Sequence, residues 1–218
     1  MRVVFGKSTF SAFLAKNVED KNVKIVLVDF NLEDSQIRTL LKLRKPPQYI
    51  DNIKDLVVNV AKNFDVLCHL DSVFPNKNEM NYWKIQEIIN QLKEEYNLII
   101  VDTSSKLENE YTKRIFYNSD EVIFLVEPNI LGVKKSKNML EVFENDWKIA
   151  NSKIKIVLNK SNMYQISDAI LEELFPEIKL IGKMKYMDSY NLMINKSVYK
   201  RELKREYEKI YKKIYNIK

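Results

Sequence analysis

The tetrapeptide Gly6-Lys7-Ser8-Thr9 has the residue types of a phosphate-binding site. In a loop of the form G-x-x-x-x-G-K-[ST], glycines let backbone N–H groups surround phosphate oxygens, the lysine neutralises charge and the hydroxyl binds Mg²⁺. The first glycine of that pattern is absent here, and Met1 stands in its place. The sequence thus supplies the second half of the loop. These four residues are candidate ligands of a nucleotide phosphate, with Ser8 also a candidate metal ligand.

A helix start is the alternative interpretation of the same residues. Serine caps helices well, so Lys7 and Ser8 can open a helix without binding a ligand. Val3 and Val4, which precede Gly6, favour strand geometry over the conformations of a glycine loop. The chain contains 3 glycines among 218 residues, far below the average usage of about 7%. The chain therefore has too few glycines to form a glycine-rich loop elsewhere.

Three further polar residues end or follow predicted buried strands: Asp29, Asp102 and Asn159. Because ligands bind beyond the carboxyl ends of parallel strands, we expect these residues to share one site with Lys7 and Ser8. The alternatives are structural. The two aspartates can accept backbone hydrogen bonds at strand ends, and asparagine suits a turn because it tolerates left-handed geometry.

Apolar, β-branched runs alternate with helical patterns along the chain. Strands are predicted at residues 2–5, 23–30, 64–70, 96–102, 121–128 and 153–160. Helices are predicted at residues 9–18, 35–43, 80–96, 133–150 and 167–175, where apolar residues recur every three or four positions. Near-continuous apolar strands indicate a sheet that is covered on both faces. We therefore expect an α/β fold with a mostly parallel central sheet flanked by helices on both faces, built as a single domain over residues 1–218.

The C-terminal segment, about residues 197–216, is predicted to form a basic amphipathic helix. Its apolar stripe consists of Tyr199, Leu203, Tyr207, Ile210, Tyr211 and Ile214. Such a helix can cover one face of the sheet or lie on an anionic membrane. We favour packing on the sheet, because the last helix of an α/β domain has this same pattern.

Composition indicates a folded, cytoplasmic protein. Apolar residues make up 45% of the chain, which excludes intrinsic disorder. The single cysteine, Cys68, allows no internal disulfide and lies in a run typical of a buried strand, as does the only histidine, His69. We expect both side chains in the core and propose no histidine catalysis. No stretch approaches the roughly 18 apolar residues of a membrane span.

The net charge of +6 is distributed over 30% charged residues of mixed sign. This pattern favours a solvated surface. Nonspecific contact with DNA phosphates, for which the lysines at 134–138 are candidates, and contact with an anionic membrane surface are less favoured alternatives.

The order of six segments resembles the ParA/MinD family of deviant Walker A ATPases. The segments are GKSTFSAFLA, VKIVLVDFN, YNLIIVDTSS, EVIFLVEPN, KIVLNK and ELFPEIKLIGKMKY, which together extend over nearly the whole chain. The resemblance implies ATP and Mg²⁺ as cofactors and a homodimer that forms across the nucleotide. By position it implies that Lys7 contacts phosphates, Ser8 binds Mg²⁺, Asp29 organises the attacking water, Asp102 lies in the second shell of the metal and Asn159 contacts adenine.

The sequence also departs from the family pattern. Arg2, Val3 and Val4 stand where the family has its signature lysine and two glycines, and Asn31 stands where a second carboxylate is common. Serines replace prolines at 104–105, and Lys185 replaces a proline near the expected adenine site. Arginine does not replace lysine equivalently, because its planar fork approaches phosphate differently.

Two functions from different classes remain. The first is a nucleotide-dependent switch with weak ATPase activity that positions or partitions a cellular assembly. The second is a pseudo-ATPase that keeps the fold and acts as a scaffold or protein-interaction module. In both cases an unidentified protein partner is expected.

Overall fold

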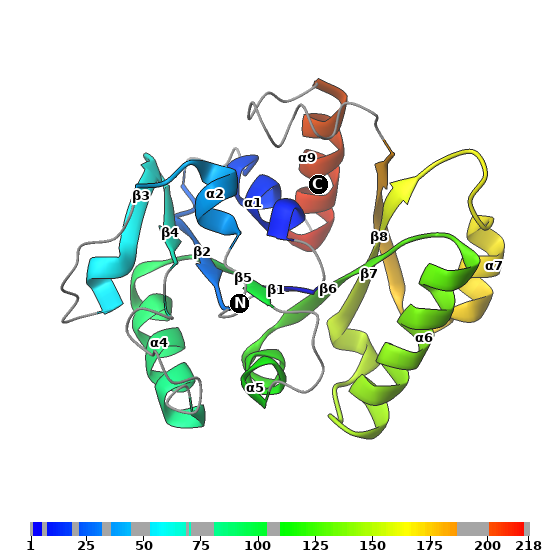
Figure 1. Cartoon of the computed structure of the whole chain (residues 1–218), viewed down its shortest axis with the longest axis horizontal. Coiled ribbons are helices and arrows are strands. Elements are labelled where there is room, and N and C mark those ends of the chain that lie inside the picture. Colours follow the sequence, from blue (N-terminus) through cyan, green and yellow to red (C-terminus); the bar gives the residue numbers. More distant parts are fainter. Residues whose placement is uncertain are drawn as a thin grey trace. The chain divides into compact units, whose positions relative to one another are not determined.

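The computed structural model describes residues 2–5, 8–18, 22–31, 36–44, 53–68, 70, 81–103, 110–186 and 201–215. The chain divides into two compact units, Met1–Asp120 and Glu121–Lys218. Each unit is an α/β assembly of its own strands and helices, coloured along the chain from blue to red in Figure 1. The prediction that residues 1–218 form a single domain stays a prediction.

The first unit contains a largely parallel sheet. Its strands are β1 (Arg2–Phe5), β2 (Ile25–Asp29), β3 (Val57–Ala61), β4 (Phe64–Leu67) and β5 (Leu98–Thr103), and its helices are α1 (Ser8–Lys16), α2 (Ile37–Leu41), the 3₁₀ helix η1 (Ile53–Leu56), α4 (Tyr82–Glu95) and α5 (Glu110–Asn118). The strand order in this unit is β3-β4-β2-β5-β1, and only β3 runs antiparallel to its neighbour, β4. Helices α1 and α2 lie on one face, and α4 and α5 on the other (Figure 1).

Hydrophobic burial explains this layered arrangement. Every residue of β2 and β5 is buried, as expected for strands with a helix layer on each face. Helix α1 is also buried over most of its length, from Thr9 through Ala15. By contrast β3 lies at the edge of the sheet and is only partly buried.

The described part of the second unit contains three parallel strands. Its elements are β6 (Glu121–Val126), α6 (Ile130–Asn145), η3 (Asn151–Lys153), β7 (Ile154–Ser161), α7 (Asp168–Leu174), β8 (Lys179–Lys185) and α9 (Arg201–Tyr215). Strand β7 pairs with β6 on one side and with β8 on the other. The side-chain oxygens of Asn129 and Ser167 cap α6 and α7.

Helix α9 packs against β8 at a glycine. A Cβ atom at Gly182 would come within 2.3 Å of Cγ1 of Ile210, so only glycine allows this close approach. Tyr207, Ile210, Tyr211 and Ile214 of the predicted apolar stripe are all buried. The preferred interpretation of this helix, packing on the sheet, is thus confirmed for its described side chains.

The structure confirms the fold class and most of the predicted elements. Arg2–Phe5 forms the predicted parallel strand and pairs with β5. Strands β3 and β8 and helix α5 were not predicted. Cys68 is buried as expected, whereas the prediction for His69 lies outside the described residues.

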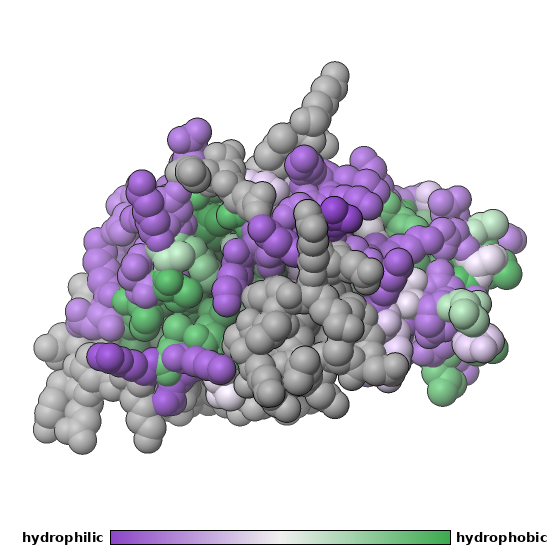
Figure 2. Space-filling model, turned by 90° about the horizontal axis from the view of Figure 1, so that it is seen from above, coloured by the Kyte–Doolittle hydropathy of each residue, from purple (hydrophilic) through white to green (hydrophobic). Residues whose placement is uncertain are grey.

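One face of the surface is shown in Figure 2. Where residues are described, this face has hydrophilic side chains over much of its area, with hydrophobic areas between them. None of the helices in the described ranges combines the length and apolar character needed to cross a bilayer.

Candidate functional site

Two aspartates lie side by side at the carboxyl edge of the first unit's sheet. Asp29 ends β2, Asp102 is the penultimate residue of β5, and the two residues are direct partners in the parallel register. Their relative exposures are 2% and 0%. The backbone N–H of Phe30 donates to the carbonyl oxygen of Asp102 at 2.9 Å, which fixes the spacing of the two strand ends. The structure therefore brings together the two carboxylates that the sequence predicted as neighbours.

The carboxylate of Asp102 is incompletely partnered. Its Oδ1 accepts a 2.7 Å hydrogen bond from the hydroxyl of Ser11. Its Oδ2 is buried and has no hydrogen-bond partner within the described part of the chain. Because a buried polar atom without a partner is costly, this oxygen marks a place where a ligand would gain binding energy.

Burial and charge both disfavour ionisation of this group. Burial raises the pKa of Asp102 to about 7, and the neighbouring charge of Asp29 adds to the shift, while the hydroxyls of Ser8 and Ser11 oppose it. A cation near Oδ2 would oppose both effects, since it would stabilise the charged form of the carboxyl group. The residues around Asp102 are therefore suited to a divalent cation or to a water molecule of its hydration shell.

Asp29 plays a local structural part as well. Its Oδ1 accepts a 3.0 Å hydrogen bond from the backbone N–H of Asn31, which holds the chain in a turn directly after β2. The alternative that this aspartate satisfies a backbone donor at a strand end is therefore realised. It does not exclude a second function, because each carboxylate oxygen has two acceptor positions.

Helix α1 brings hydroxyl groups to Asp102. Ser8 starts the helix and is partly buried, Thr9 is buried, and Ser11 is fully buried against Asp102. Gly6 and Lys7 lie outside the described residues, so their predicted contacts with phosphate stay predictions. The sequence reasoning missed Ser11. Its spacing of three from Ser8, which places both on one helix face, was the available signal.

Asn159 belongs to the second unit, where it lies within β7 and pairs with Met184 of β8. The interpretation of Asn159 as a left-handed turn residue is wrong. The positive φ of 59° belongs to the next residue, Lys160, while Asn159 keeps strand geometry because it still pairs with β8. Lys160 forms a 2.6 Å ion pair with Glu127. The predicted contact of Asn159 with adenine stays a prediction.

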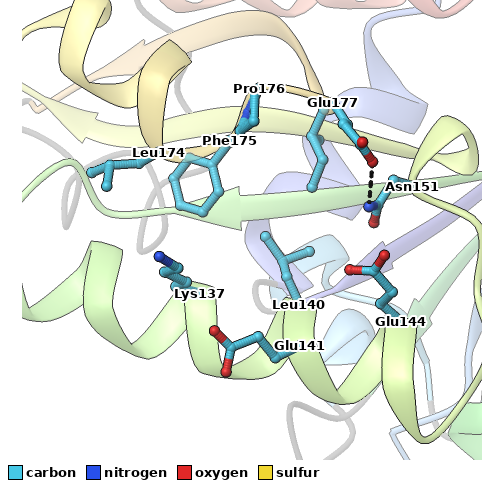
Figure 3. A pocket seen from close by; sticks show the side chains of 10 residues that line it. Lys137, Leu140, Glu141, Glu144, Asn151, Leu174, Phe175, Pro176 and Glu177 are labelled. Carbon is cyan, nitrogen blue, oxygen red and sulfur yellow. Dashed lines mark hydrogen bonds between the residues drawn. The ribbon is translucent and has the colours of Figure 1, made fainter.

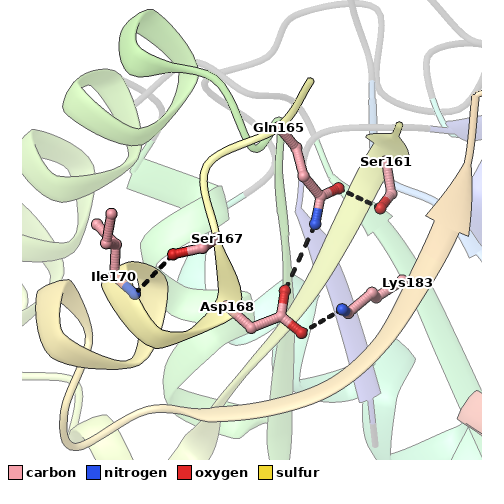
Figure 4. Close-up of polar contacts among 6 residues, drawn as sticks. All are labelled: Ser161, Gln165, Ser167, Asp168, Ile170 and Lys183. Carbon is pink, nitrogen blue, oxygen red and sulfur yellow. Dashed lines mark hydrogen bonds and ion pairs between the residues drawn. The ribbon is translucent and has the colours of Figure 1, made fainter. Parts of the chain in front are cut away.

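A hydrogen-bonded cluster fixes the loop that follows β7 (Figure 4). Ser161 bonds to Gln165, which donates a 3.4 Å hydrogen bond to Asp168, and Asp168 forms an ion pair with Lys183 of β8. Each member is partnered, so this cluster acts as a support for the loop rather than as a ligand site.

A small hollow of about 250 Å³ lies in the second unit between α6 and the turn from α7 to β8 (Figure 3). Leu140 and Phe175 lie at its base, and Asn151 donates a 3.0 Å hydrogen bond to Glu177 at its rim. Its residues precede β7 and β8, at the amino ends of these strands. None of the predicted site residues lines it.

Metal ligation by protein side chains alone is not supported in the described residues. No group of three or more histidine, cysteine, aspartate or glutamate side chains gathers there in a way that could hold an ion. Mg²⁺ in nucleotide sites needs fewer protein ligands, because phosphates and waters supply the remainder. Ser8 and Asp102 are sufficient in kind for such a site.

Comparisons with known proteins identify the fold. No family model matches the chain. The septum site-determining protein MinD of Helicobacter pylori is 23% identical over 187 residues, and the match covers 82% of this chain and 66% of that protein. Among solved structures, a ParA family ATPase from Chlorobium tepidum has a TM-score of 0.77 at 14% identity and covers 94% of this chain and 95% of its own.

Another similar structure was solved with a bound nucleotide. MinD from Pyrococcus horikoshii, solved in complex with Mg-ADP, has a TM-score of 0.77 at 17% identity, covering 98% of this chain and 94% of its own. The chain has the fold of the ParA/MinD family of deviant Walker A ATPases. The resemblance seen in the sequence is thus confirmed at the level of the ParA/MinD fold. In that fold the partly unpartnered Asp102 lies at the carboxyl edge of the strands, where ligands of open α/β sheets bind.

Proposed function

We propose that the chain is a ParA/MinD-type switch that binds ATP and Mg²⁺ and takes part in positioning or partitioning a cellular assembly, with weak ATPase activity. The observation that carries this proposal is the buried Asp102, whose Oδ2 has no partner among the described residues and which lies beside Asp29. A relative with the same fold was solved with Mg-ADP.

Each site residue has a distinct part in this proposal. The hydroxyl of Ser8, the first residue of α1, would hold the metal, and Lys7 would contact the phosphates. Asp102 would accept a hydrogen bond from a water in the hydration shell of the metal, and Asp29 would orient the attacking water. Mg²⁺, when bound, neutralises charge on the phosphate oxygens. Gly6 and Thr9 add backbone and hydroxyl donors, and Asn159 contacts the base.

A second candidate, a pseudo-ATPase scaffold, is favoured by the start of the chain. Strand β1 ends at Phe5 and α1 begins at Ser8, so two residues separate them. Val3 and Val4 pair in register with Val101 and Asp102 and are therefore strand residues. Because each lost backbone donor of a preorganised anion site can cost roughly 10²-fold in rate, turnover would suffer more than binding.

Titration calorimetry with ATP, ADP and Mg²⁺ tests the switch. The wild type is expected to bind nucleotide in a Mg²⁺-dependent manner, and Lys7→Ala is expected to abolish binding. Lys16→Ala, at the exposed end of the same helix, is the matched control and should bind normally. If no heat is detected at millimolar nucleotide, the switch is ruled out and the scaffold remains.

Partners follow from the same proposal. We propose a cytoplasmic homodimer that forms with nucleotide and contacts a further protein, in preference to a membrane surface or DNA. Light scattering with and without ATP is the test of the homodimer. A dimer that appears with ATP supports it, whereas one monomeric mass in both conditions contradicts it.

A further inference from the structure

A larger cavity lies in the first unit, at the opposite edge of the sheet from Asp29 and Asp102. Its volume is about 470 Å³, within the roughly 300–1,000 Å³ typical of small-molecule sites. It lies where β2, β4 and β5 begin, between η1, β3 and α4. Ile53, Ile88 and Leu92 supply buried apolar surface to its lining.

One wall of the cavity is a rigid polar cluster around Asp65. The phenolic hydroxyl of Tyr96 donates to Oδ2 of Asp65 at 2.8 Å, and Nδ2 of Asn59 donates to Oδ1 at 2.7 Å. Burial raises the pKa of Tyr96, and its hydrogen bond to Asp65 raises it further, so the phenol keeps its proton. Both carboxylate oxygens therefore have donors, and the ring of Tyr96 is fixed in place.

The lysines Lys24 and Lys62 are brought together by the backbone. The backbone N–H of Ile25 donates to the carbonyl oxygen of Asn63 at 2.8 Å. Lys24 precedes Ile25 and Lys62 precedes Asn63, so the two lysines lie at the same part of the cavity rim. Nζ of Lys24 lies 4.5 Å from the centre of the Tyr96 ring. The backbone of Lys24 is also fixed, because its N–H donates to Oδ1 of Asn97 at 2.9 Å.

Lys54 and Glu95, which also line the cavity, neutralise each other's charge. Nζ of Lys54 forms a 2.8 Å ion pair with Oε1 of Glu95. In total the lining has three lysines and two carboxylates. Both oxygens of the Asp65 carboxylate already accept hydrogen bonds. No ion pair joins Lys62 to another residue in the described ranges, so the electrostatic balance at the rim favours an anion.

We propose that this cavity binds a small organic anion, a carboxylate with an apolar body, as a second ligand site separate from the nucleotide site. The carboxylate lies between Lys24 and Lys62, because charge-assisted hydrogen bonds to ammonium groups are the strongest polar contacts on offer. The apolar body lies on Ile53, Ile88 and Leu92 and against the Tyr96 ring.

The test uses 4-phenylbutyrate as the probe and follows backbone amide chemical shifts of the full chain. Saturable shifts are expected in residues 53–57 and 88–96. Two further compounds separate charge from apolar surface. 4-Phenylbutylammonium, with the same body and the opposite charge, should bind at least about tenfold more weakly, and inorganic phosphate, which has no apolar body, should cause no shifts in these residues.

Substitutions locate the anion. The double variant Lys24→Ala, Lys62→Ala should weaken 4-phenylbutyrate binding about tenfold, and Lys62→Glu alone should also weaken it. Lys93→Ala, an exposed lysine of α4 outside the cavity, is the matched control and should bind as the wild type does. Equal binding of the ammonium compound, unchanged affinity in both lysine variants, or shifts confined to other residues would overturn the proposal. None of these results depends on whether the chain binds ATP.

Discussion

Two buried aspartates of the first unit, Asp65 and Asp102, differ in how completely they are partnered. Both lie in parallel strands and are at most 8% exposed. Each oxygen of Asp65 accepts a hydrogen bond. Oδ1 of Asp102 accepts a hydrogen bond from Ser11, but its Oδ2 has no partner in the described part of the chain. Asp65 thus stabilises the fold through both oxygens, and under the proposed function Asp102 binds a ligand at the expense of stability.

The largest expected effect is the pH-dependent stability of Asp102→Asn. Because the folded-state pKa of Asp102 is raised from 3.8 to about 7, the folded protein holds this proton more tightly than the unfolded chain, and the wild type loses stability as pH rises between these two values. The neutral variant avoids this loss. It should be more stable than the wild type by about 2 kcal/mol near pH 5 and by about 4 kcal/mol near pH 8, as measured by urea unfolding without ligand.

A flat difference between Asp102→Asn and the wild type from pH 5 to pH 8 would contradict this prediction. Such a result would mean that Asp102 ionises normally despite its burial.

The same substitution at the other carboxylate should have the opposite sign. Asp65→Asn replaces an acceptor oxygen with an N–H₂ group that meets the donors of Tyr96 or Asn59. The variant should lose about 2 kcal/mol of unfolding free energy at pH 7. Tyr96→Phe in the same assay tests the hydrogen bond from its other side. If Asp65→Asn is as stable as the wild type, the comparison of the two carboxylates fails.

The smallest effect is expected for Ser11→Ala. The substitution removes the 2.7 Å hydrogen bond to Asp102 Oδ1 and should destabilise the chain by about 1 kcal/mol above pH 7. Because the lost donor favours the charged carboxylate, the pKa of Asp102 should rise further. Urea unfolding at pH 8 measures the first effect. Ser11→Thr, which keeps the hydroxyl, serves as the control, and an unchanged pKa in Ser11→Ala would contradict the assigned contact.

Much of the fold follows from the sequence because strands that are buried on both faces are apolar throughout. This held for β2 and β5, which are fully buried. It failed for β3, which lies at the edge of the sheet, is partly exposed and therefore has no continuous apolar run. It also failed for β8, where Gly182 interrupts the apolar run because Ile210 leaves no space for a larger side chain.

The site was predicted only in part. The strand-end rule placed Asp29 beside Asp102, because neighbouring parallel strands end together. Ser11 was missed, since its importance depends on which face of α1 meets β5. The contact of Tyr96 with Asp65 joins residues that are 31 positions apart. It joins β4 to the residue that ends α4, and no local pattern in the sequence reveals this contact.

The pKa of Asp102, followed by carbon NMR of its carboxyl group with and without Mg²⁺ and ADP, tests the central claim most directly. The account predicts a pKa near 7 in the free protein and a fall of about one unit or more at saturating Mg²⁺ and ADP, because the cation stabilises the carboxylate. The wild type with ADP alone is the control for the metal. An unchanged pKa in the presence of Mg²⁺ and ADP would contradict the assignment of Asp102 to a nucleotide-bound metal.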